Sequence, residues 1–436
     1  MNANALSERI EKHEARITVI GQGYVGMPLA IAFAHAGYKV IGLDNSREKV
    51  ESLNNGRSPI PDVAHSDLQE MRAAGRYSAT TDYSVLADTD VAIVCVPTPL
   101  RKTKDPDISY VIAAAEELAE HLHPGQLIVL ESTTYPGTTE EILLPMFSEK
   151  GGEAGVDFFL AFSPERIDPA NPNFKVRDIP KVVGGVTGEC SKLAAKLYQQ
   201  VVPKVLEVSS PRVAEMAKLY ENVFRNVNIA LANELALMCH RLGVNTREVI
   251  DAASTKPFGF MTFHPGPGVG GHCIGIDSQY LAWKMKLNGY DARFIHLAEE
   301  INQSMPGRVV QMTADALNNR QRSLKGAKVL ALGVAYKPNV SDTRESPALE
   351  VIHLLQQRGA EVTYADPHVP SIGYNGSQLN AVLADEAAIK GADCVLILTD
   401  HKEFDYKQIA GDASLVVDTR NATWGILNPK AEVIRL

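Results

Sequence analysis

The segment Arg16–Asp44, RITVIGQGYVGMPLAIAFAHAGYKVIGLD, carries the pattern on which the fold prediction rests. Its first five residues, RITVI, form a short apolar run that is typical of a buried strand. Three glycines follow in G-x-G-x-x-G spacing, and the apolar stretch Pro28–Ala36 predicts a helix. KVIGLD then predicts a second strand that ends in Asp44. The segment is therefore predicted to form a strand, a glycine turn, a helix and a second strand parallel to the first.

The glycine spacing indicates a site for a dinucleotide. In such turns the first glycine permits the tight bend, the second lets the backbone approach a pyrophosphate, and the third lets the helix pack closely on the strand. The N-terminus of the helix also faces the phosphates. We therefore predict cofactor contacts at Gly21, Gly23, Tyr24, Val25 and Gly26.

Asp44 stands where these folds recognise the ribose of the cofactor. A carboxylate there accepts a hydrogen bond from the 2′-hydroxyl and repels a 2′-phosphate, so NAD is favoured over NADP. Arg47 lies nearby and is the feature that favours NADP instead. A plain glycine turn in an α/β protein is the alternative interpretation, and the complete strand, turn, helix and strand context argues against it.

Composition bounds the class of protein. The chain has 436 residues, enough for two or three domains, with 45% hydrophobic residues and a formal net charge of −9. That charge gives no overall attraction to nucleic acid or to an anionic membrane. No apolar run is long enough to span a bilayer, and the polar N-terminus lacks the apolar core of a signal peptide. Five scattered cysteines without a C-x-x-C pair argue against a disulfide framework and a zinc site, so we expect a cytoplasmic protein and no metal.

Further strands are predicted along the first half of the chain. DVAIVCVPTP, QLIVLEST and FFLAFSPER are apolar runs that each end in polar residues, and helical stretches separate them. Strands that alternate with helices predict a parallel sheet. Since ligands of such sheets bind beyond the carboxyl ends of the strands, we expect VPTP, ESTT and SPER to lie at one edge.

The texture changes after the first half. The segment Pro211–Leu242 has a long helical pattern without internal glycine, ends at Gly243, and is apolar on more than one side, which predicts a central spine or an oligomer contact. The alternation of strands and helices then returns. It repeats the pattern of strand, glycine turn, helix and strand, and the last of these strands ends in Asp366. We predict two Rossmann-like parallel-sheet domains joined by a long-helix domain, with the divisions 1–207, 208–320 and 321–436.

Cys273 lies in a glycine-rich stretch, GPGVGGHCIGIDSQYL, which covers Gly266–Leu281. A thiol is nucleophilic as the thiolate, and at an ordinary pKa of ~8.5 little thiolate exists at neutral pH. Exposed backbone N–H groups of a glycine turn, or a helix that starts at DSQYLAWK, would stabilise that anion or an oxyanion. A packed small residue is the alternative, and it suits the other four cysteines better. His272 is a candidate base, or a packed or solvent-facing imidazole.

Two groups of polar residues are candidates for binding a ligand, the first an anionic or hydroxylated one and the second a phosphate. Lys218, Asn222 and Arg225 have helical spacing that places them on one face, although a solvated helix edge is the alternative. Lys337 and Arg344 bracket a turn after a predicted strand, where cations would meet phosphate, and a surface turn is the alternative.

Taken together, GQGYVGMPLA, VPTPL, ESTTYPGTTEE, SPER, AEMAKLYEN, PGPGVGGHCIGID and GVAYKPNVSDTRESPA resemble the UDP-glucose/UDP-N-acetylmannosamine dehydrogenase family. The matches run in order from about Arg16 to Arg420. Within the family, STKPFGFMTFHPGPG and DPANPNF are most similar to UDP-N-acetylglucosamine 6-dehydrogenases, which serve bacterial surface polysaccharides such as lipopolysaccharide O-antigen. The resemblance names the three predicted domains as NAD-binding, dimerisation and UDP-sugar-binding.

The resemblance implies two successive oxidations at C6 of the sugar, with NAD as the cofactor. Cys273 would attack the aldehyde, and the thiohemiacetal would be oxidised to a thioester that water hydrolyses. Lys218 would transfer protons and stabilise an oxyanion, Asp277 would hold Lys218 or the water, and Glu165 with Thr134 would position the water. The implied catalytic residues are Cys273, Lys218, Asp277, Asn222, Glu165 and Thr134.

The resemblance also implies the binding contacts. Thr98 and Thr133 would line the nicotinamide side of the cofactor. The implied contacts to the UDP-sugar are Arg166, Ile167, Lys218, Asn222, Arg225, Gly268, Tyr336, Lys337, Arg344 and Arg420. The implied partners are a UDP-sugar and a further copy of the chain, in a homodimer or higher homo-oligomer, with no nucleic acid and no membrane.

One departure from the family pattern matters. Relatives usually have GHCIPIDPFYL, whereas this chain has Gly275 and Ser278 at the two proline positions, so two fixed φ angles become freer. Rival functions remain open. The same chemistry on UDP-N-acetylmannosamine, UDP-N-acetylgalactosamine or UDP-glucose is the nearest. A two-electron hydroxyacid dehydrogenase and a non-catalytic nucleotide-binding protein are more remote, because neither needs the Cys273 loop.

Overall fold

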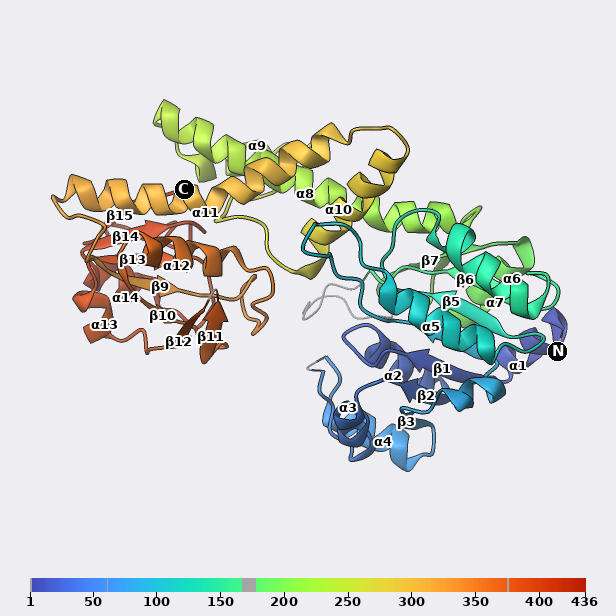
Figure 1. Ribbon diagram of the computed structural model, residues 1–436. Helices are drawn as coiled ribbons and strands as arrows, with labels where there is room; N and C mark the ends of the chain where they lie inside the picture. Colours follow the sequence, from blue (N-terminus) through green and yellow to red (C-terminus); the bar gives the residue numbers. More distant parts are fainter. Residues whose placement is uncertain (1, 61, 167–177, 375) are drawn as a thin grey trace. The chain divides into compact units, whose positions relative to one another are not determined.

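The computed structural model (Figure 1) describes the chain except residues 1, 61, 167–177 and 375, and of residues 272, 273 and 377 it describes the backbone alone. The chain forms two compact units. The first comprises Met1–Glu221 and Gln279–Gly289, and the second comprises Asn222–Ser278 and Tyr290–Leu436. Both units have an α/β architecture, as the alternating pattern predicts.

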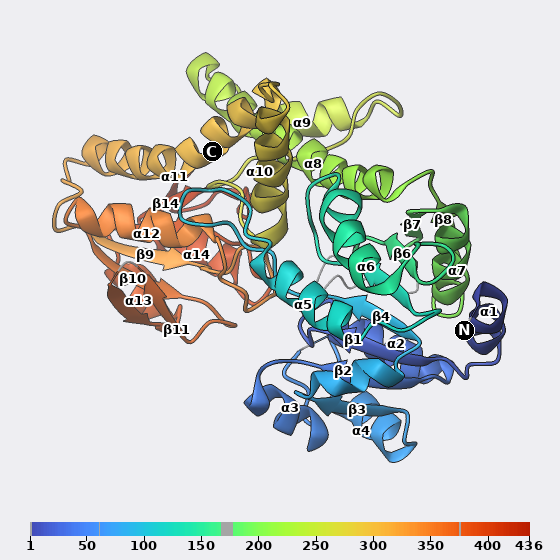
Figure 2. The ribbon, with the colours of Figure 1, turned by 45° about the vertical axis from the view of Figure 1, so that its right-hand side comes forward.

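An eight-stranded sheet organises the first unit (Figure 2), in the spatial order β3-β2-β1-β4-β5-β6-β7-β8. The first six strands are parallel and follow the order 3-2-1-4-5-6 of doubly wound dinucleotide folds. β7 runs antiparallel to β6, and β8 runs parallel to β7, so the sheet departs from the purely parallel one that we predicted. The strands are β1 (Arg16–Ile20), β2 (Lys39–Leu43), β3 (Tyr77–Thr80), β4 (Val91–Val94), β5 (Leu127–Leu130), β6 (Phe159–Phe162), β7 (Lys181–Gly185) and β8 (Val205–Glu207).

Apolar cores cover both faces of this sheet. Ile17 and Val19 of β1 belong to one core with Phe33, while Ile20 belongs to the other with Phe147. Because alternate side chains of a strand point to opposite faces, a strand buried on both faces is mainly apolar, and the buried polar side chain of β1, Thr18, is hydrogen-bonded to Thr89. The helical elements of the unit outside the long helix are α1 (Ala3–Glu11), α2 (Gly26–Ala36), α3 (Arg47–Asn54), α4 (His65–Ala73), η1 (Tyr83–Asp88), α5 (Ser109–Glu120), η2 (Thr139–Leu143), α6 (Leu144–Gly151) and α7 (Gly188–Tyr198).

The long helix α8 spans Pro211–Leu242, the range predicted from the sequence. Proline is favourable at its first position, and Gly243 follows its last residue with φ +66°. Its first turns belong to the first unit, and the remainder, from Asn222, belongs to the second. The prediction of a central long helix is therefore confirmed.

The second unit contains a five-stranded parallel sheet in the order β10-β9-β13-β14-β15 and a separate antiparallel hairpin, β11 and β12. The sequence did not predict β15. The strands are β9 (Lys328–Leu332), β10 (Glu361–Ala365), β11 (Ser371–Tyr374), β12 (Ser377–Asn380), β13 (Cys394–Ile397), β14 (Leu415–Asp418) and β15 (Glu432–Arg435). The remaining helices are α9 (Thr246–Ser254), α10 (His272–Leu287, which ends in the first unit), α11 (Arg293–Asn319), α12 (Pro347–Gln357), α13 (Glu386–Gly391) and α14 (Tyr406–Asp412).

The start of α10 corrects one expectation. We expected a helix to begin at DSQYLAWK, but α10 begins at His272, so Cys273 and Gly275 lie within its first turns. The division of the chain at residues 207 and 320 stays a prediction. In the part of the chain that the structure describes, no helix is both long and apolar enough to cross a bilayer.

Candidate active site

The glycine turn after β1 has the geometry that a dinucleotide site requires. Gly21 has φ +93°, and a Cβ on it would collide with the backbone carbonyl of Cys95. A Cβ on Gly26, the first residue of α2, would collide with the carbonyl of Gly21. Gly23 has open space at its Cβ position. The turn therefore places Tyr24 and Val25 at the start of a helix, with bare backbone at Gly23 for a ligand to approach.

Asp44 is buried at the carboxyl end of β2, and backbone groups fix its carboxylate. Oδ2 accepts a hydrogen bond from the Gln22 N–H at 2.9 Å, and Oδ1 accepts one from the Ser46 N–H at 3.0 Å. Lys49 Nζ also pairs with Oδ2, at 2.7 Å. Lys49 was not predicted as part of this site, although it lies one helical turn after Ser46. Arg47, the residue that favours NADP, is exposed at the start of α3.

The ends of β4, β5 and β6 meet at one edge of the first sheet, as predicted. The Val96 N–H donates to Ser132 Oγ at 2.9 Å, which joins VPTP to ESTT. Thr98 and Thr134 are buried, and Thr133 is half-buried. Thr134 Oγ1 shares a hydrogen bond with the Thr138 hydroxyl, so its orientation is fixed by the chain that follows.

Glu165 and Arg166 follow β6 at this same edge. Glu165 Oε1 accepts from the Arg166 N–H at 2.6 Å, and Oε2 lies 3.3 Å from Lys181 Nζ. The guanidinium of Arg166 pairs with Glu221 at 2.6 Å and donates to the Pro180 carbonyl at 2.8 Å. Ile167, a predicted substrate contact, lies outside the described residues.

Lys218 is buried on α8, one turn after Glu215. Glu215 was not predicted. Its carboxylate accepts hydrogen bonds from the Gly137 N–H at 2.6 Å, the Thr139 N–H at 3.0 Å and the Thr139 hydroxyl at 2.7 Å. Burial raises the pKa of Glu215, while these hydrogen bonds lower it, and burial outweighs them. Glu215 therefore attaches the start of α8 to the loop after ESTT.

In the second unit, Asn222 of α8 donates a hydrogen bond from Nδ2 to Oδ2 of Asp277 on α10. Both side chains are buried. The structure thus brings together two of the predicted catalytic residues. Arg225, the third member of the predicted stripe, is exposed, so burial separates it from Lys218 and Asn222.

A ladder of buried asparagines, which was not predicted, extends this contact. Asn302 of α11 donates to Asn226 Oδ1 at 2.8 Å and accepts from Asn233 Nδ2 at 2.9 Å. Asn233 Oδ1 accepts the Gly266 N–H at 2.9 Å, and Asn226 Nδ2 donates to Ser278 Oγ at 3.3 Å. The ladder therefore links the start of the glycine-rich loop to α10. The helical spacing of Asn226 and Asn233, which follow Asn222 at intervals of four and seven residues on α8, was the available sign.

The glycine-rich loop before Cys273 packs against side chains of the second unit. A Cβ on Gly266 would lie 2.5 Å from the guanidinium of Arg420, and one on Gly271 would lie 2.8 Å from the Tyr336 ring. A Cβ on Gly268 would lie 3.0 Å from Pro347, and Gly268 has φ +137°. Close packing therefore explains these glycines, in addition to the exposed amides that the sequence pattern indicates.

Cys273 is the second residue of α10, and its side chain lies outside the description. The first turn of a helix has unpaired N–H groups and a positive dipole end, which favour a thiolate. The other four cysteines are buried. Burial raises the pKa of Cys394 to about 12 and that of Cys95 well above its ordinary value, so these two remain thiols, as the packed interpretation predicts.

The predicted phosphate-binding cations lie on two loops of the second unit. Arg344 pairs with Asp342 through two nitrogens, at 3.0 Å and 2.6 Å. Lys337 Nζ lies 5.6 Å from the centre of the Tyr336 ring. Arg420 Nε donates to the Leu398 carbonyl at 2.8 Å, after β13.

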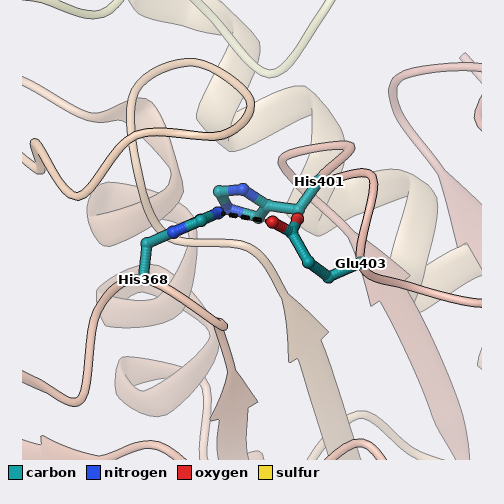
Figure 3. Close-up of side chains that lie close together, drawn as sticks. All are labelled: His368, His401 and Glu403. Atoms are coloured by element: carbon teal, nitrogen blue, oxygen red, sulfur yellow. Dashed lines mark ion pairs between the residues drawn. The ribbon is translucent and has the colours of Figure 1, made fainter. Parts of the chain in front are cut away.

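Figure 3 shows a cluster of His368, His401 and Glu403, which follow the carboxyl ends of β10 and β13. His401 is fully buried, and both ring nitrogens already serve the fold. Nε2 lies 3.0 Å from Asp366 Oδ2, and Nδ1 accepts the Asn339 N–H at 3.0 Å. A metal ligand needs a free ring nitrogen, so this cluster stabilises the loops after the strands. Asp366, the counterpart of Asp44, also serves the fold, because its carboxylate accepts a hydrogen bond from the Val334 N–H at 2.7 Å as well as pairing with His401.

The fold and this site define an NAD-dependent dehydrogenase with a second, α/β nucleotide-binding region. Comparison with known families gives the finer class: the chain belongs to the UDP-glucose/GDP-mannose dehydrogenase family. The family's NAD-binding domain matches residues 15–202, its central domain residues 212–304, and its UDP-binding domain residues 330–424. The protein is thus an NAD-dependent UDP-sugar dehydrogenase, as the sequence resemblance predicts.

Named relatives span several sugars. The chain is 37% identical over 414 residues to a UDP-N-acetyl-D-mannosamine dehydrogenase of Pyrococcus horikoshii, covering 93% of this chain and 95% of the relative. It is 37% identical over 358 residues to a UDP-N-acetyl-D-glucosamine 6-dehydrogenase of Pseudomonas aeruginosa, covering 82% and 83%. The solved structure of the Pyrococcus horikoshii UDP-D-ManNAc dehydrogenase superposes with a TM-score of 0.86 at 34% identity, covering 96% of this chain and 98% of that one.

Proposed function

We propose that the protein oxidises UDP-N-acetylglucosamine at C6 to the uronic acid in a four-electron reaction. The observation that carries the proposal is the position of Cys273 in the first turn of α10, on the same helix as Asp277, which Asn222 holds. A hydroxyacid dehydrogenase that stops after two electrons needs no such nucleophile. NAD accepts a hydride in each of the two oxidations.

The residues of the chain would act in a fixed order. The Cys273 thiolate would add to the aldehyde carbon, and the second oxidation would convert this adduct to a thioester. Water would then add to the carbonyl carbon, the carbon–sulfur bond would break, and the thiolate would leave. Lys218 would stabilise the oxyanions, and Glu165 with Thr134 would orient the water. Covalent attachment keeps the aldehyde from escaping between the two oxidations.

The remaining predicted contacts belong to the two nucleotides. We assign the cofactor to Gly21, Gly23, Tyr24, Val25, Gly26, Asp44, Thr98 and Thr133. We assign the UDP-sugar to Arg166, Ile167, Arg225, Gly268, Tyr336, Lys337, Arg344 and Arg420, together with Lys218 and Asn222. The three matched family ranges support the division of the chain into NAD-binding, central and UDP-sugar-binding domains near residues 207 and 320.

The choice of N-acetylglucosamine rests on the motifs STKPFGFMTFHPGPG and DPANPNF. A relative named for N-acetylmannosamine and one named for N-acetylglucosamine are both 37% identical to this chain, so identity alone does not select the sugar. The test is NADH formation over a panel of four UDP-sugars: N-acetylglucosamine, N-acetylmannosamine, N-acetylgalactosamine and glucose. We expect the highest kcat/KM with N-acetylglucosamine, two NADH per sugar and no free aldehyde. One NADH per sugar would refute the four-electron reaction, and a higher kcat/KM with another sugar would reassign the substrate.

We also propose a cytoplasmic homo-oligomer, at least a dimer, that supplies a bacterial surface polysaccharide. α8 supports the assembly, because large apolar side chains on it are exposed. They are Val213, Met216, Tyr220, Phe224, Leu231, Met238 and Leu242. The described cysteines are free and buried, which suits a reducing compartment.

A further inference from the structure

A buried chain of charges lies behind Glu165 in the first unit. Lys181 Nζ lies 2.9 Å from Glu131 Oε2 and 3.3 Å from Glu165 Oε2, and it also donates to the Pro164 carbonyl at 3.2 Å. An ammonium has three protons, and these three acceptors use all of them. Glu131 Oε1 accepts the hydroxyl proton of Tyr198. The order from inside outward is therefore Tyr198, Glu131, Lys181 and Glu165.

The exposed fraction of these side chains increases from Glu131 to Glu165. The Glu131 side chain is 0% exposed, that of Lys181 is 6% exposed and that of Glu165 is 13% exposed. Burial opposes the charge on Lys181, but Glu131 and Glu165 favour it, and its pKa is raised. Burial also raises the pKa of Glu131, although Lys181 and the Tyr198 hydroxyl lower it. Lys181 therefore lies between two acidic side chains that favour its charge.

The sheet topology explains how Lys181 reaches this place. β7 pairs antiparallel with β6, with Phe162 opposite Gly184. If this register is continued three residues past Phe162, Glu165 stands opposite Lys181, the first residue of β7. A parallel β7 would have brought its first residue to the opposite edge of the sheet. The antiparallel pairing of β7 with β6 therefore delivers a cation to the edge where β5 and β6 end.

We propose that Lys181, held by Glu131 and Tyr198, is a positioning residue that fixes the carboxylate of Glu165 for its work on the hydrolytic water. The proposal rests on the function proposed above, in which Glu165 orients the water. Glu165 Oε1 is occupied by the Arg166 N–H and Oε2 by Lys181, so the plane of the carboxylate is set by both. Removal of Lys181 would take away the ammonium contact to Oε2, and the orientation of the carboxylate would be less fixed.

Glu131 and Tyr198, the two innermost residues of this row of side chains, have a separate role. Lys181 can orient Glu165 only if its own side chain is held in place. A buried cation without a compensating charge is also energetically unfavourable. Glu131 supplies the compensating charge, and Tyr198 fixes Glu131 in turn. Nζ of Lys181 also lies 5.2 Å from the centre of the Tyr198 ring. Two residues therefore hold the lysine on the side away from Glu165.

The test compares Lys181→Met with the wild-type enzyme in steady-state and single-turnover kinetics. Lys181 acts after both oxidations, so we expect kcat to fall about 100-fold, as for a misplaced catalytic group. KM for the UDP-sugar should fall with it because the adduct accumulates, so kcat/KM should change less than about threefold. The NADH burst of the first turnover should remain, and the mass of the intact protein should reveal a sugar adduct on Cys273 that wild type does not accumulate. A variant that merely loosened the fold would lose the burst together with kcat.

Two further variants keep the test decisive. If Lys181→Met does not fold, the pair Glu131→Gln and Lys181→Met removes opposite charges together and gives the same measurement. Lys192→Met is the matched control, since Lys192 pairs with Glu189 at 2.8 Å on the surface of α7 and should retain wild-type kcat. Turnover within about threefold of wild type, or a slow enzyme without the adduct, overturns the proposal.

Glu165→Gln separates failure of the inference from failure of the proposed function. If Glu165→Gln accumulates the adduct and the Lys181 variants do not, the role of Lys181 is refuted and the proposed reaction stands. If neither accumulates an adduct, the water-orienting role of Glu165 is wrong, and the role of Lys181 falls with it.

Discussion

The asparagine ladder of the second unit offers a stability change that can be worked out from its hydrogen bonds. Asn302 is 5% exposed and donates to Asn226 twice, at 2.8 Å to Oδ1 and 3.3 Å to the backbone carbonyl, while it accepts from Asn233 at 2.9 Å. Asn302→Ala removes these bonds and leaves polar groups of both partners buried. Each orphaned buried group costs about 1–3 kcal/mol. We therefore expect the free energy of unfolding of this unit to fall by about 3 kcal/mol.

The two tryptophans allow that change to be measured in the second unit alone, because Trp283 belongs to the first unit and Trp424 to the second. In a Trp283→Phe background, urea unfolding followed by Trp424 fluorescence gives the midpoint and the m value of this unit. Gln303→Ala is the matched control on the exposed side of the same helix and should cost less than about 0.5 kcal/mol. A loss below about 0.5 kcal/mol for Asn302→Ala would refute the ladder as a stabilising network.

Three further results are expected. Asp44 should make kcat/KM for NAD+ about 100-fold higher than for NADP+, and Asp44→Ser should reduce this preference. Equal kcat/KM values for the two cofactors in wild type would mean that Lys49 or Arg47, and not Asp44, determines recognition of the ribose. Light scattering at micromolar protein should give at least a dimer, and Leu231→Glu, at a site 58% exposed on α8, should weaken it; an active wild-type monomer would contradict the assembly. Burial raises the pKa of Asp366, but hydrogen bonds from His401 and the Val334 N–H outweigh burial and lower it. Its stabilising contribution is therefore present above about pH 4, the ordinary aspartate range, and is lost as the pH falls through the lower folded value, so Asp366→Asn should flatten the acid limb of a plot of Tm against pH.

Much of the architecture followed from local pattern, because local pattern is what builds it. RITVI, the glycine turn and the helix before KVIGLD form one βαβ unit whose two strands pair directly with each other. α8 ended where predicted because Pro211 and Gly243 mark its two ends. In each case the residues that determine the element lie inside it or next to it.

The features that were missed depend on distant partners. α10 begins at His272 although glycines and a cysteine are poor helix formers. The Ser278 hydroxyl donates to the Ile274 carbonyl at 2.9 Å and accepts from Asn226, and a proline at position 278 would lack the backbone N–H that continues the helix. Lys181 gave no local sign of its role, since a lysine before an apolar strand is ordinary. Its importance arises from Glu131 and Glu165, which are far away in the sequence.

The two glycine clusters both allow close approach because glycine lacks a Cβ, but the groups that approach them differ. Gly21 and Gly26 let backbone meet backbone, which shapes a turn that is complete within the first α/β domain. Gly266 and Gly271 let the loop before α10 meet Arg420 and Tyr336, which lie on the part of the chain that matches the UDP-binding domain. The backbone of Cys273 is therefore placed by the same residues that we assign to the UDP-sugar. On the proposed function, recognition of the nucleotide and placement of the nucleophile are parts of one packing arrangement, so a substitution at Tyr336 would change kcat as well as KM.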